Sequence, residues 1–309
     1  MFNRNTLIPF SLLLLLSGLC SLVASPSSTS PNMGAPKQPS GDTQQNFPPI
    51  RSFEVETLAK LGCDIYRQDK YAWIATDVMF ECVGKERMRA EGVQGWVVDE
   101  SNAIALVRFL RKNGEEMESA YDVRCPKDKK PYLEVPRERS LTPFQRLRYL
   151  AFCSAHQGMM KGHYPLCKVN SSYNKVVLDD PTGKGFLVYF LRPKENKDEV
   201  PIGGNYRVSI DSDGKTVTQV DRLSASCLTL NLPQGNLRGG KKPDYMMTTH
   251  LVSNTPLETH VFASLQEGLP LYVGTPDGRI WVTDKGKIIF LDTLSHLETD
   301  PDKSKSLAK

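Results

Sequence analysis

The chain has 309 residues, of which 24% are charged and 39% are hydrophobic, and its formal net charge is +4. This apolar content can fill a core, which excludes a wholly disordered or fibrous protein. The weak positive charge predicts neither nucleic-acid binding nor membrane-surface binding. The length allows one large domain or two ordinary ones.

Residues 1–24 predict an export signal. Arg4 is the first charged residue, and the apolar stretch from Leu7 to Ala24 contains five consecutive leucines. A basic start, an apolar centre and small residues at the exit are typical of a secretory signal peptide. A membrane-spanning anchor, which needs roughly 20 predominantly apolar residues, is the alternative. We therefore expect a periplasmic or secreted protein that touches a membrane only through an uncleaved signal or an attached lipid.

In an exported protein, the seven cysteines of this chain are candidates for lipidation or for disulfide bonds. Cys20 lies in the signal, and its lipidation would make the chain a membrane-anchored lipoprotein, although Leu19 stands where that signal needs a small residue. The others are Cys63, Cys82, Cys125, Cys153, Cys167 and Cys227. An even number of cysteines in an exported chain predicts a disulfide framework, with buried free thiols as the alternative.

Residues 25–50 are rich in Ser, Pro and Gln and predict a flexible tether. From Phe53 to Val83 the apolar residues recur at helical spacing, which we interpret as two short helices divided near Gly62. Three apolar segments then predict a three-stranded antiparallel meander: 95–98, 103–110 and 119–123. Residues 51–136 are thus expected to form a helical segment plus a meander.

Residues 137–292 predict a further helix and a larger antiparallel β region. Thr142, Pro143 and Gln145 form a capping-box pattern, so a helix is expected to run to about Gln157 and stop at Gly158. Its expected apolar face consists of Phe144, Leu147, Leu150 and Ala151. Hairpin signals predict strands at 173–178, 186–191, 205–210, 216–220, 271–274, 279–282 and 287–291.

A second capping-box pattern, from Thr255 to Glu258, predicts a short helix at 260–266 among these strands. Residues 293–309 form a charged tail. The predicted fold class is therefore α+β, with antiparallel sheets and a few short helices.

His250, Glu258 and His260 are the candidate acid–base residues, because they are ionisable and lie near a polar loop. No nucleophile motif accompanies them. A histidine beside Val261 and Phe262 is more often a half-buried residue with satisfied hydrogen bonds, and that interpretation stays open beside the catalytic one.

Cys153, His156, His163 and Cys167 have the ligand types of a zinc site, but their spacing is not one of the usual structural-zinc spacings. Pairing of the cysteines in disulfides is the alternative. The segment 235–242 nearly matches a phosphate-binding loop, yet Lys242 replaces the required hydroxyl. We expect no metal and no cofactor.

Arg67, Asp69 and Trp73 are candidate binding residues. Asp69 and Trp73 are four residues apart, so they share a face of the predicted helix. The alternative is that Trp73 is a core aromatic on the inner face of a helix that covers a sheet.

Four stretches resemble a group of exported proteobacterial proteins of uncharacterised activity: 66–77 (YRQDKYAWIATD), 173–191, 203–228 and 249–281. The resemblance implies a bacterial periplasm and supplies no catalytic residues. It also favours a bridge between Cys167 and Cys227 among the fifteen connectivities that six cysteines allow. The architecture of signal, tether and α+β body has a looser similarity to envelope immunity proteins that neutralise secreted lipase toxins.

These observations predict an exported, non-enzymatic protein-binding module of the bacterial envelope, with an immunity or inhibitor protein against a secreted toxin as its specific form. A protein is the expected partner. The alternative is a periplasmic hydrolase that uses His250, His260 and Glu258. A third interpretation, an envelope-tethered scaffold, depends on lipidation of Cys20.

Overall fold

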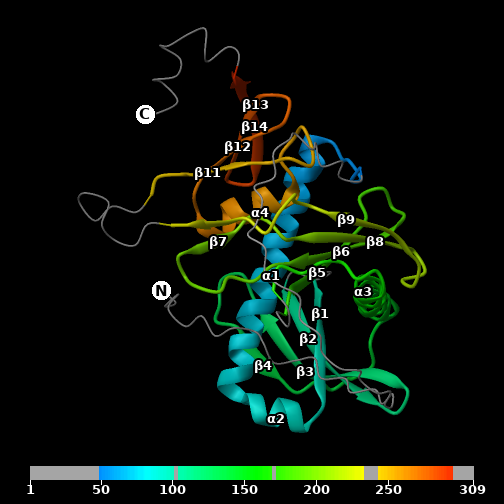
Figure 1. Ribbon diagram of the computed structural model, residues 1–309. Coiled ribbons are helices and arrows are strands. Elements are labelled where there is room, and N and C mark those ends of the chain that lie inside the picture. Colours follow the sequence, from blue (N-terminus) through cyan, green and yellow to red (C-terminus); the bar gives the residue numbers. More distant parts are fainter. Residues whose placement is uncertain (1–48, 101–103, 169–171, 233–242, 295–309) are drawn as a thin grey trace, which may run out of the picture.

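The computed structural model describes residues 49–100, 104–168, 172–232 and 243–294. It confirms the α+β class: helices pack on three four-stranded sheets, accompanied by a small two-stranded pair (Figure 1). The predicted signal peptide, Cys20, nearly all of the predicted tether and the tail beyond Leu294 lie outside the described residues.

The first sheet is the predicted meander with one additional strand. Its order is β1-β2-β3-β4, and every pairing in it is antiparallel. The strands are β1 (Val93–Asp99), β2 (Ala105–Asn113), β3 (Glu116–Cys125) and β4 (Tyr132–Glu134). The sequence predicts no strand at β4, which lies in a charged link and is held at the sheet edge by pairing with β3.

A single long helix, α1 (Val55–Cys82), replaces the two short helices predicted around Gly62. Gly62 lies where α1 meets the later helix α4 (Glu258–Glu267). A Cβ at Gly62 would be 2.5 Å from Val261 Cβ and 2.7 Å from the Glu258 carbonyl oxygen. The glycine is therefore a packing residue that lets two helices approach closely, and its low helix propensity, about 1 kcal/mol below alanine, does not end α1. After α1, Gly84 leads into the short helix α2 (Lys85–Ala90).

The second sheet confirms both predicted hairpins. Its order is β5-β6-β8-β9, formed by β5 (Asn174–Asp179), β6 (Gly185–Leu191), β8 (Tyr206–Asp211) and β9 (Val217–Arg222). Helices cover both faces of this sheet. Along β6, Leu187 and Tyr189 pack with residues of α1, whereas Val188 and Phe190 pack with residues of the helix α3 (Pro143–Lys161). Burial on both faces explains the continuous apolar run of β6.

The capping box that begins α3 is confirmed, but the helix ends later than predicted, and its predicted inner face is correct only in part, at Leu147 and Ala151. Thr142 Oγ1 accepts the Gln145 amide at 3.3 Å, and Gln145 Oε1 accepts the Thr142 amide at 3.2 Å. The helix continues past Gly158, where a Cβ would stand 2.9 Å from Val217 Cγ2, so this glycine also serves packing. The buried residues of α3 are Gln145, Arg148, Ala151, Ala155 and Met159. The predicted face lies partly outward, and Phe144 is exposed.

The third sheet has the order β11-β12-β13-β14. Its strands are β11 (Met246–Thr249), β12 (Leu271–Gly274), β13 (Arg279–Asp284) and β14 (Lys287–Thr293). The pairing of β11 with β12 is parallel, because α4 connects them as a crossover. The predicted helix is confirmed as α4, but Leu257 rather than Thr255 caps it, and His260 Nδ1 accepts the Leu257 amide at 2.9 Å. The remaining pair is β7 (Glu199–Pro201) with β10 (Thr229–Asn231).

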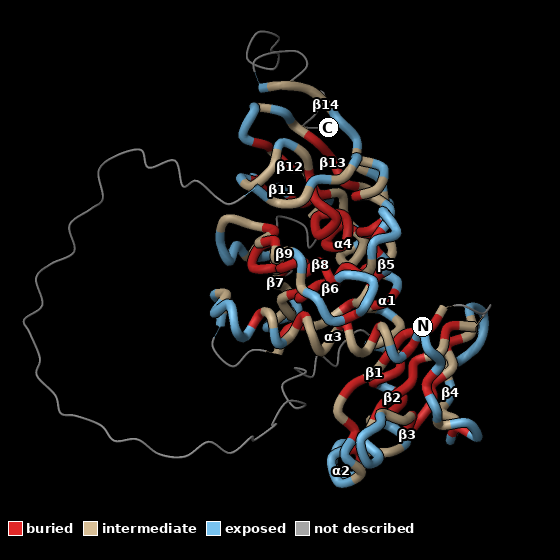
Figure 2. The backbone as a smooth tube through the Cα atoms, turned by 90° about the vertical axis from the view of Figure 1, so that its right-hand side faces the viewer, coloured by how far each residue is buried: buried red, intermediate tan, exposed pale blue. Residues whose placement is uncertain are grey.

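Helix α1 joins the cores of the first and second sheets. Its first half contributes Leu58, Leu61 and Ile65 to the core beneath the second sheet. Its second half contributes Ala75 and Met79 to the core of the first sheet. Figure 2 shows buried segments both in the first sheet, at the lower right, and in the second sheet, in the middle of the view. The predicted regions 51–136 and 137–292 therefore share one helix.

We expect Gly62→Ala to lower the free energy of unfolding by about 1–2 kcal/mol, because overpacking against Val261 and the Glu258 carbonyl outweighs the gain in helix propensity. Urea denaturation measures this. Gln157→Ala, at an exposed position of α3, is the control and should change stability by no more than about 0.5 kcal/mol. A stabilised Gly62→Ala variant would contradict the packing role of this glycine.

Candidate functional site

A cleft opens between α1 and α3, where the first and second sheets meet. One stripe of α1 lines it at helical spacing: Lys60, Asp64, Arg67, Gln68 and Ala72. The cleft has a charged outer cavity of about 320 Å³ and an apolar inner pocket of about 60 Å³. Gln68 and Arg148 line both cavities and so stand at their junction.

The charges of the outer cavity pair with one another. Arg67 forms ion pairs with Glu100 at 2.5 Å and with Asp64 at 2.9 Å. Arg148, reaching in from α3, contacts Asp179 at 3.0 Å. These pairs connect α1 with the end of β1, and α3 with the end of β5. The outer cavity is therefore polar but nearly balanced in charge.

The three predicted binding residues do not form one surface. Arg67 lines the outer cavity. Asp69 accepts a hydrogen bond from Asn174 Nδ2 at 3.3 Å, and burial raises the pKa of its carboxyl to about 6. Trp73 is 46% exposed, so it is not the core aromatic that the sequence favours. Asp69 thus connects α1 to β5, while Trp73 faces outward.

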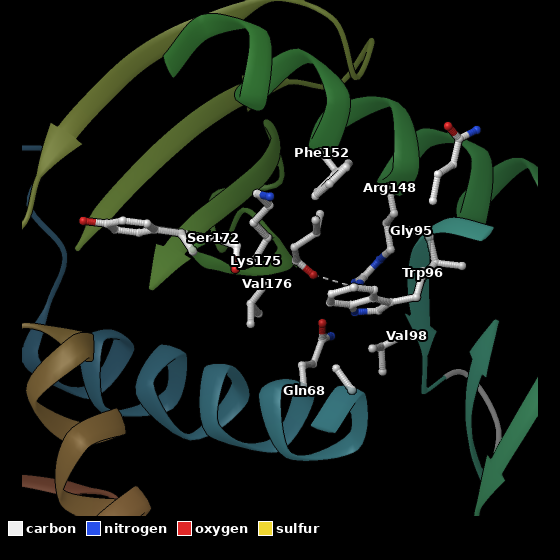
Figure 3. Close-up of a pocket in the computed structure, with 14 residues that line it drawn as sticks. Gln68, Gly95, Trp96, Val98, Arg148, Phe152, Ser172, Lys175 and Val176 are labelled. Atoms are coloured by element: carbon white, nitrogen blue, oxygen red, sulfur yellow. Dashed lines mark hydrogen bonds between the residues drawn. The ribbon is translucent and has the colours of Figure 1, made fainter. Parts of the chain in front are cut away.

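The inner pocket lies between α1, β1, α3 and β5 (Figure 3). Trp96 of β1 and Phe152 of α3 form aromatic walls, and Val98 and Val176 add aliphatic surface. Lys175 lies on the wall contributed by β5. The sequence does not predict this pocket. The one sign of it is that a charged residue lies on the predicted inner face of a helix whose other residues on that face are apolar.

The candidate acid–base residues do come together, but inside the protein. The rings of His250 and His260 meet edge to face with centroids 4.7 Å apart. His250 Nε2 contacts Ser253 Oγ at 2.8 Å. Burial, and then the neighbouring His260, lower the pKa of His250 to about 2, and burial lowers the pKa of His260 to about 4. Both residues are only 3% exposed, so they are shielded from a dissolved substrate, and their lowered pKa values keep them neutral at pH 7.

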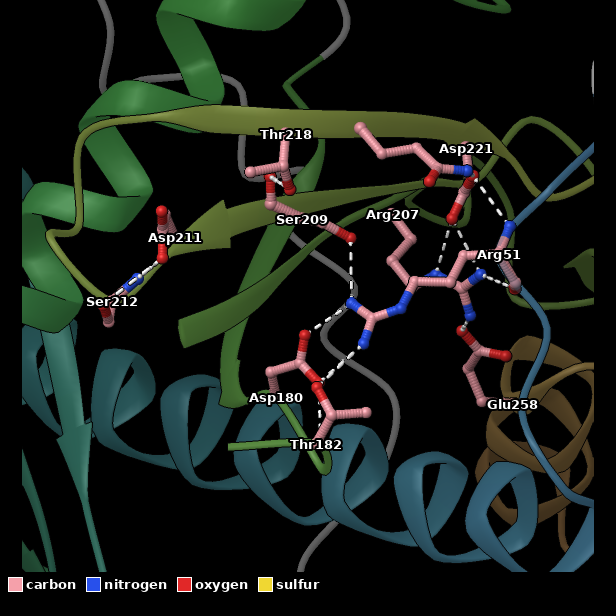
Figure 4. Close-up of polar contacts among 11 residues, drawn as sticks. Arg51, Asp180, Thr182, Arg207, Ser209, Asp211, Ser212, Thr218, Asp221 and Glu258 are labelled. Carbon is pink, nitrogen blue, oxygen red and sulfur yellow. Dashed lines mark hydrogen bonds and ion pairs between the residues drawn. The ribbon is translucent and has the colours of Figure 1, made fainter. Parts of the chain in front are cut away.

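Glu258 takes part in a buried ion-pair network rather than in a site open to solvent (Figure 4). Arg207 Nη1 donates to Glu258 Oε1 at 2.7 Å, and Arg207 Nη2 donates to Asp221 Oδ2 at 2.7 Å. Arg207 also donates to the carbonyl of Arg51, whose guanidinium binds Asp180. The Phe53 ring lies 4.8 Å from both guanidinium carbons. This network joins β8, β9, α4 and the segment before α1.

The bridge between Cys167 and Cys227 is confirmed, with a Cα–Cα distance of 5.6 Å. It indicates an oxidising compartment. The wider disulfide framework is wrong: Cys63, Cys82, Cys125 and Cys153 are free thiols. Burial raises the pKa of Cys125 to about 11, which keeps this thiol protonated.

The structure does not assemble the zinc candidates Cys153, His156, His163 and Cys167. The sulfur of Cys167 is bonded to Cys227. In the described ranges, no group of three or more His, Cys, Asp or Glu side chains could hold a metal ion.

The segment 235–242, which nearly matches a phosphate-binding loop, lies outside the described residues. No described helix is long and apolar enough to cross a membrane.

Apolar side chains cross the outer face of the third sheet, where Met247 is exposed but Val282, in the middle of the face, is buried. Met247, Tyr272, Val282 and Ile289 are direct cross-strand neighbours and so share one face. Tyr245 packs edge to face on Tyr272, with ring centroids 5.4 Å apart. The opposite face is covered by α4. We call these five residues the outer row.

At the sheet edge, β14 contributes Ile289 to this outer face, whereas Phe290 lies on the opposite face and packs edge to face on Trp281, with ring centroids 5.2 Å apart. Ile289 is 45% exposed and the neighbouring Phe290 is 47% exposed. In the described part of the chain, β14 ends the sheet, and no further strand pairs with it. An exposed apolar edge strand presents unpaired backbone groups together with a hydrophobic flank.

No protein-family model, curated protein or solved structure matches this chain.

We expect acid to destabilise the fold through its two buried histidines. Their pKa values are lower in the folded protein than the ordinary 6.5, so the stability they contribute is complete above pH 6.5 and is lost as pH falls toward about 4 and about 2. Each histidine accounts for up to about 1.4 kcal/mol per pH unit. His250→Gln should flatten the dependence of unfolding free energy on pH between 6 and 4.5.

Protonation of Asp69 changes the free energy of unfolding in the opposite direction to protonation of the histidines. Its pKa is raised in the folded protein, so its protonation stabilises the fold as pH falls below about 6. Asp69→Asn should therefore make the free energy of unfolding fall more steeply as pH decreases, whereas His250→Gln should make that fall shallower. Urea titrations at several pH values measure both effects, and parallel curves for wild type and His250→Gln would contradict the burial of this ring.

We expect alkylation of the denatured, unreduced protein to modify Cys63, Cys82, Cys125 and Cys153, with two more cysteines modified after reduction. In the native protein, exposed Cys82 should react first and buried Cys125 last. Peptide mass spectrometry identifies the sites. Protection of any of these four in the unreduced denatured protein would show a further disulfide.

Proposed function

We propose that the chain is an exported, non-enzymatic protein-binding module of the bacterial envelope, and that the third sheet holds its partner. The observation that carries this proposal is the open apolar edge of β14 beside the outer row. The Cys167–Cys227 disulfide supports an oxidising compartment. The acid–base candidates are buried and engaged in internal contacts, which favours binding over hydrolysis by these residues.

The geometry of β14 favours a partner that adds a strand. From Lys287 to Leu291 its edge pairs with no described strand, so it can donate and accept main-chain hydrogen bonds along an extended segment. On that edge, Ile289 flanks one face of the sheet and Phe290 flanks the other. A segment with apolar side chains at successive positions would cover both. Aromatic and methionine side chains such as Tyr245 and Met247 are enriched in protein interfaces.

The specific form that we propose is an immunity or inhibitor protein against a secreted toxin. Strand addition would block a toxin by occupying a segment that the toxin needs for folding or substrate access. The resemblance to exported proteobacterial proteins supports the location, and the looser similarity to envelope immunity proteins supports the partner class. The identity of the gene next to this one distinguishes a toxin partner from another envelope protein.

We expect the Ile289→Lys, Phe290→Lys double variant to lose capture of the partner that wild type retains from envelope extracts, because two charges at the edge oppose strand addition. Loss of at least about 10-fold in affinity is expected from removal of two buried apolar contacts. Quantitative mass spectrometry of captured proteins measures this.

Met160→Lys is the matched control, since Met160 is an exposed apolar residue on α3, away from the third sheet. It should capture the partner as wild type does. Equal capture by wild type and the double variant would contradict the role of β14. A protein that captures nothing and shows hydrolytic turnover would contradict the proposed function itself.

A further inference from the structure

The turn that begins β14 shows which of its backbone groups face away from β13. Lys285 and Gly286 form a two-residue turn between Asp284 and Lys287. Both turn residues have positive φ, 48° and 79°, as a type I′ turn requires. Such a turn is closed by a hydrogen bond from the amide of its last residue to the carbonyl of its first. Lys287 therefore forms a hydrogen-bonded pair with Asp284.

The main-chain groups at the open edge of β14 belong to Ile288 and Phe290. Opposite residues in an antiparallel ladder alternate between hydrogen-bonded and non-hydrogen-bonded pairs. Counted from the turn, Ile289 bonds to β13, whereas Ile288 and Phe290 occupy the alternate positions. Their amides and carbonyls therefore point away from β13. In the described part of the chain, no further strand pairs with them there.

The side chains at this edge do not protect it from pairing. From Ile288 to Leu291 every residue is apolar, and the segment contains neither a charge nor a proline. Ile289 and Phe290 are both nearly half exposed. Unpaired backbone groups flanked by exposed apolar side chains are a template for pairing with another chain.

The open edge of β14 is complementary to a second copy of itself. In an antiparallel pair, residues that lie opposite each other share a face of the sheet. Placing Ile289 opposite Ile289 of the second copy meets this condition, and it also places each Ile288 opposite the other copy's Phe290. In both of these flanking pairs the backbone groups face outward, so each pair can exchange both of its hydrogen bonds. A pairing centred on Phe290 would instead use Leu291, which has no partner on β13 because the ladder is irregular there.

The charges at the two ends of β14 favour the same arrangement. Lys287 stands at the start of the strand, and Asp292 stands near its end. Before the strand, Asp284 and Lys285 offset each other, with their charged groups 3.9 Å apart. Two antiparallel copies bring the basic start of each strand beside the acidic end of the other. Twofold symmetry makes this contact twice, and symmetric dimers of this kind are the commonest oligomers.

We propose that β14 pairs with β14 of a second copy of this chain, in an antiparallel dimer whose twofold axis passes between the two Ile289 residues. The two third sheets then form one continuous sheet, and the outer rows of the two copies meet across the axis. This dimer rests on the proposed function only in that both assign β14 as a strand-pairing edge. A partner's strand and the second copy compete for the same backbone groups, so the dimer is the form of the protein without its partner.

Sedimentation velocity of the purified full chain over the micromolar range measures the dimer with no other protein present. We expect wild type to pass from monomer to dimer as its concentration rises. Ile289→Lys and Ile289→Asp should each raise the dissociation constant at least about 10-fold, because like charges then face each other across the axis. An equimolar mixture of these two variants should dimerise again, because opposite charges then meet. Ile289 is nearly half exposed, so both variants should fold, and circular dichroism checks this.

Met160→Lys and Met160→Asp are the matched controls, since Met160 is an exposed apolar residue of α3, and each should dimerise as wild type does. Ile289→Cys gives a second readout in a Cys82→Ser background, which removes an exposed thiol. The Cα atoms of a non-hydrogen-bonded pair are about 4.5 Å apart, within reach of a disulfide. Mild oxidation should therefore link two chains of this variant. Phe290→Cys should stay unlinked, because Ile288 lies opposite it.

Wild type that stays monomeric throughout the micromolar range overturns the proposal. A dimer that persists in both Ile289 variants overturns it as well, and so does a mixture of the two that fails to dimerise. None of these outcomes contradicts the proposed function, which is tested separately by capture of a partner from envelope extracts.

Discussion

The buried guanidinium of Arg207 is the contact on which the arrangement of this protein depends. An unpaired charge in such a position would be prohibitively costly, so the fold must bring Asp221 and Glu258 to it. An apolar cluster of equal volume could be as stable, because desolvation consumes much of the attraction in a buried ion pair. What the network adds is a constraint on position, because Glu258 pairs with Arg207 only when α4 lies beside the second sheet. The position of Glu258 in the first turn of α4 is favourable for the same carboxylate, because a helix N-terminus attracts negative charge.

The same network determines where the cleft lies. Arg207 binds the Arg51 carbonyl, and Arg51 in turn binds Asp180 at the end of the β5 hairpin. The chain therefore enters α1 at a fixed point on the second sheet, and the length of α1 carries it on to the first sheet. The cleft lies where the first and second sheets meet, with α1 on one side and α3 on the other. Its polar stripe on α1 is a consequence of this path, since the opposite stripe is occupied by core residues.

Local patterns predicted most of the strands, the capping box of α3 and the existence of α4, because turn chemistry and apolar alternation are encoded by neighbouring residues. The wrong predictions have one physical cause: contacts between distant parts of the chain, rather than neighbouring residues, determined the structure at those positions. Gly62 and Gly158 have poor helix propensity, yet each lies inside a helix because another element packs where a side chain would be. Arg148 looks like a surface residue in the sequence, but its hydrogen bonds to β5 let it occupy the inner face of α3. Of the acid–base candidates, His250 and His260 contact each other, whereas Glu258 pairs with Arg207, a partner that no local motif reveals.

The cleft and the edge of β14 lie on two sides of the first half of α1, and the packing of this helix determines how they are connected. On one side, Lys60 and Asp64 line the cleft. On the other, Cys63 contacts the turn that begins β14, where a Cβ at Gly286 would lie 2.6 Å from the Cys63 sulfur. The adjacent residue, Gly62, leaves no space between α1 and α4. Close-packed contacts of this kind transmit a displacement only when the helix has a second way to pack. The contacts at the two glycines leave no spare volume, which disfavours a second packing arrangement. The close-packed turn of α1 therefore separates the cleft from the exposed edge of β14 and opposes movement of one relative to the other.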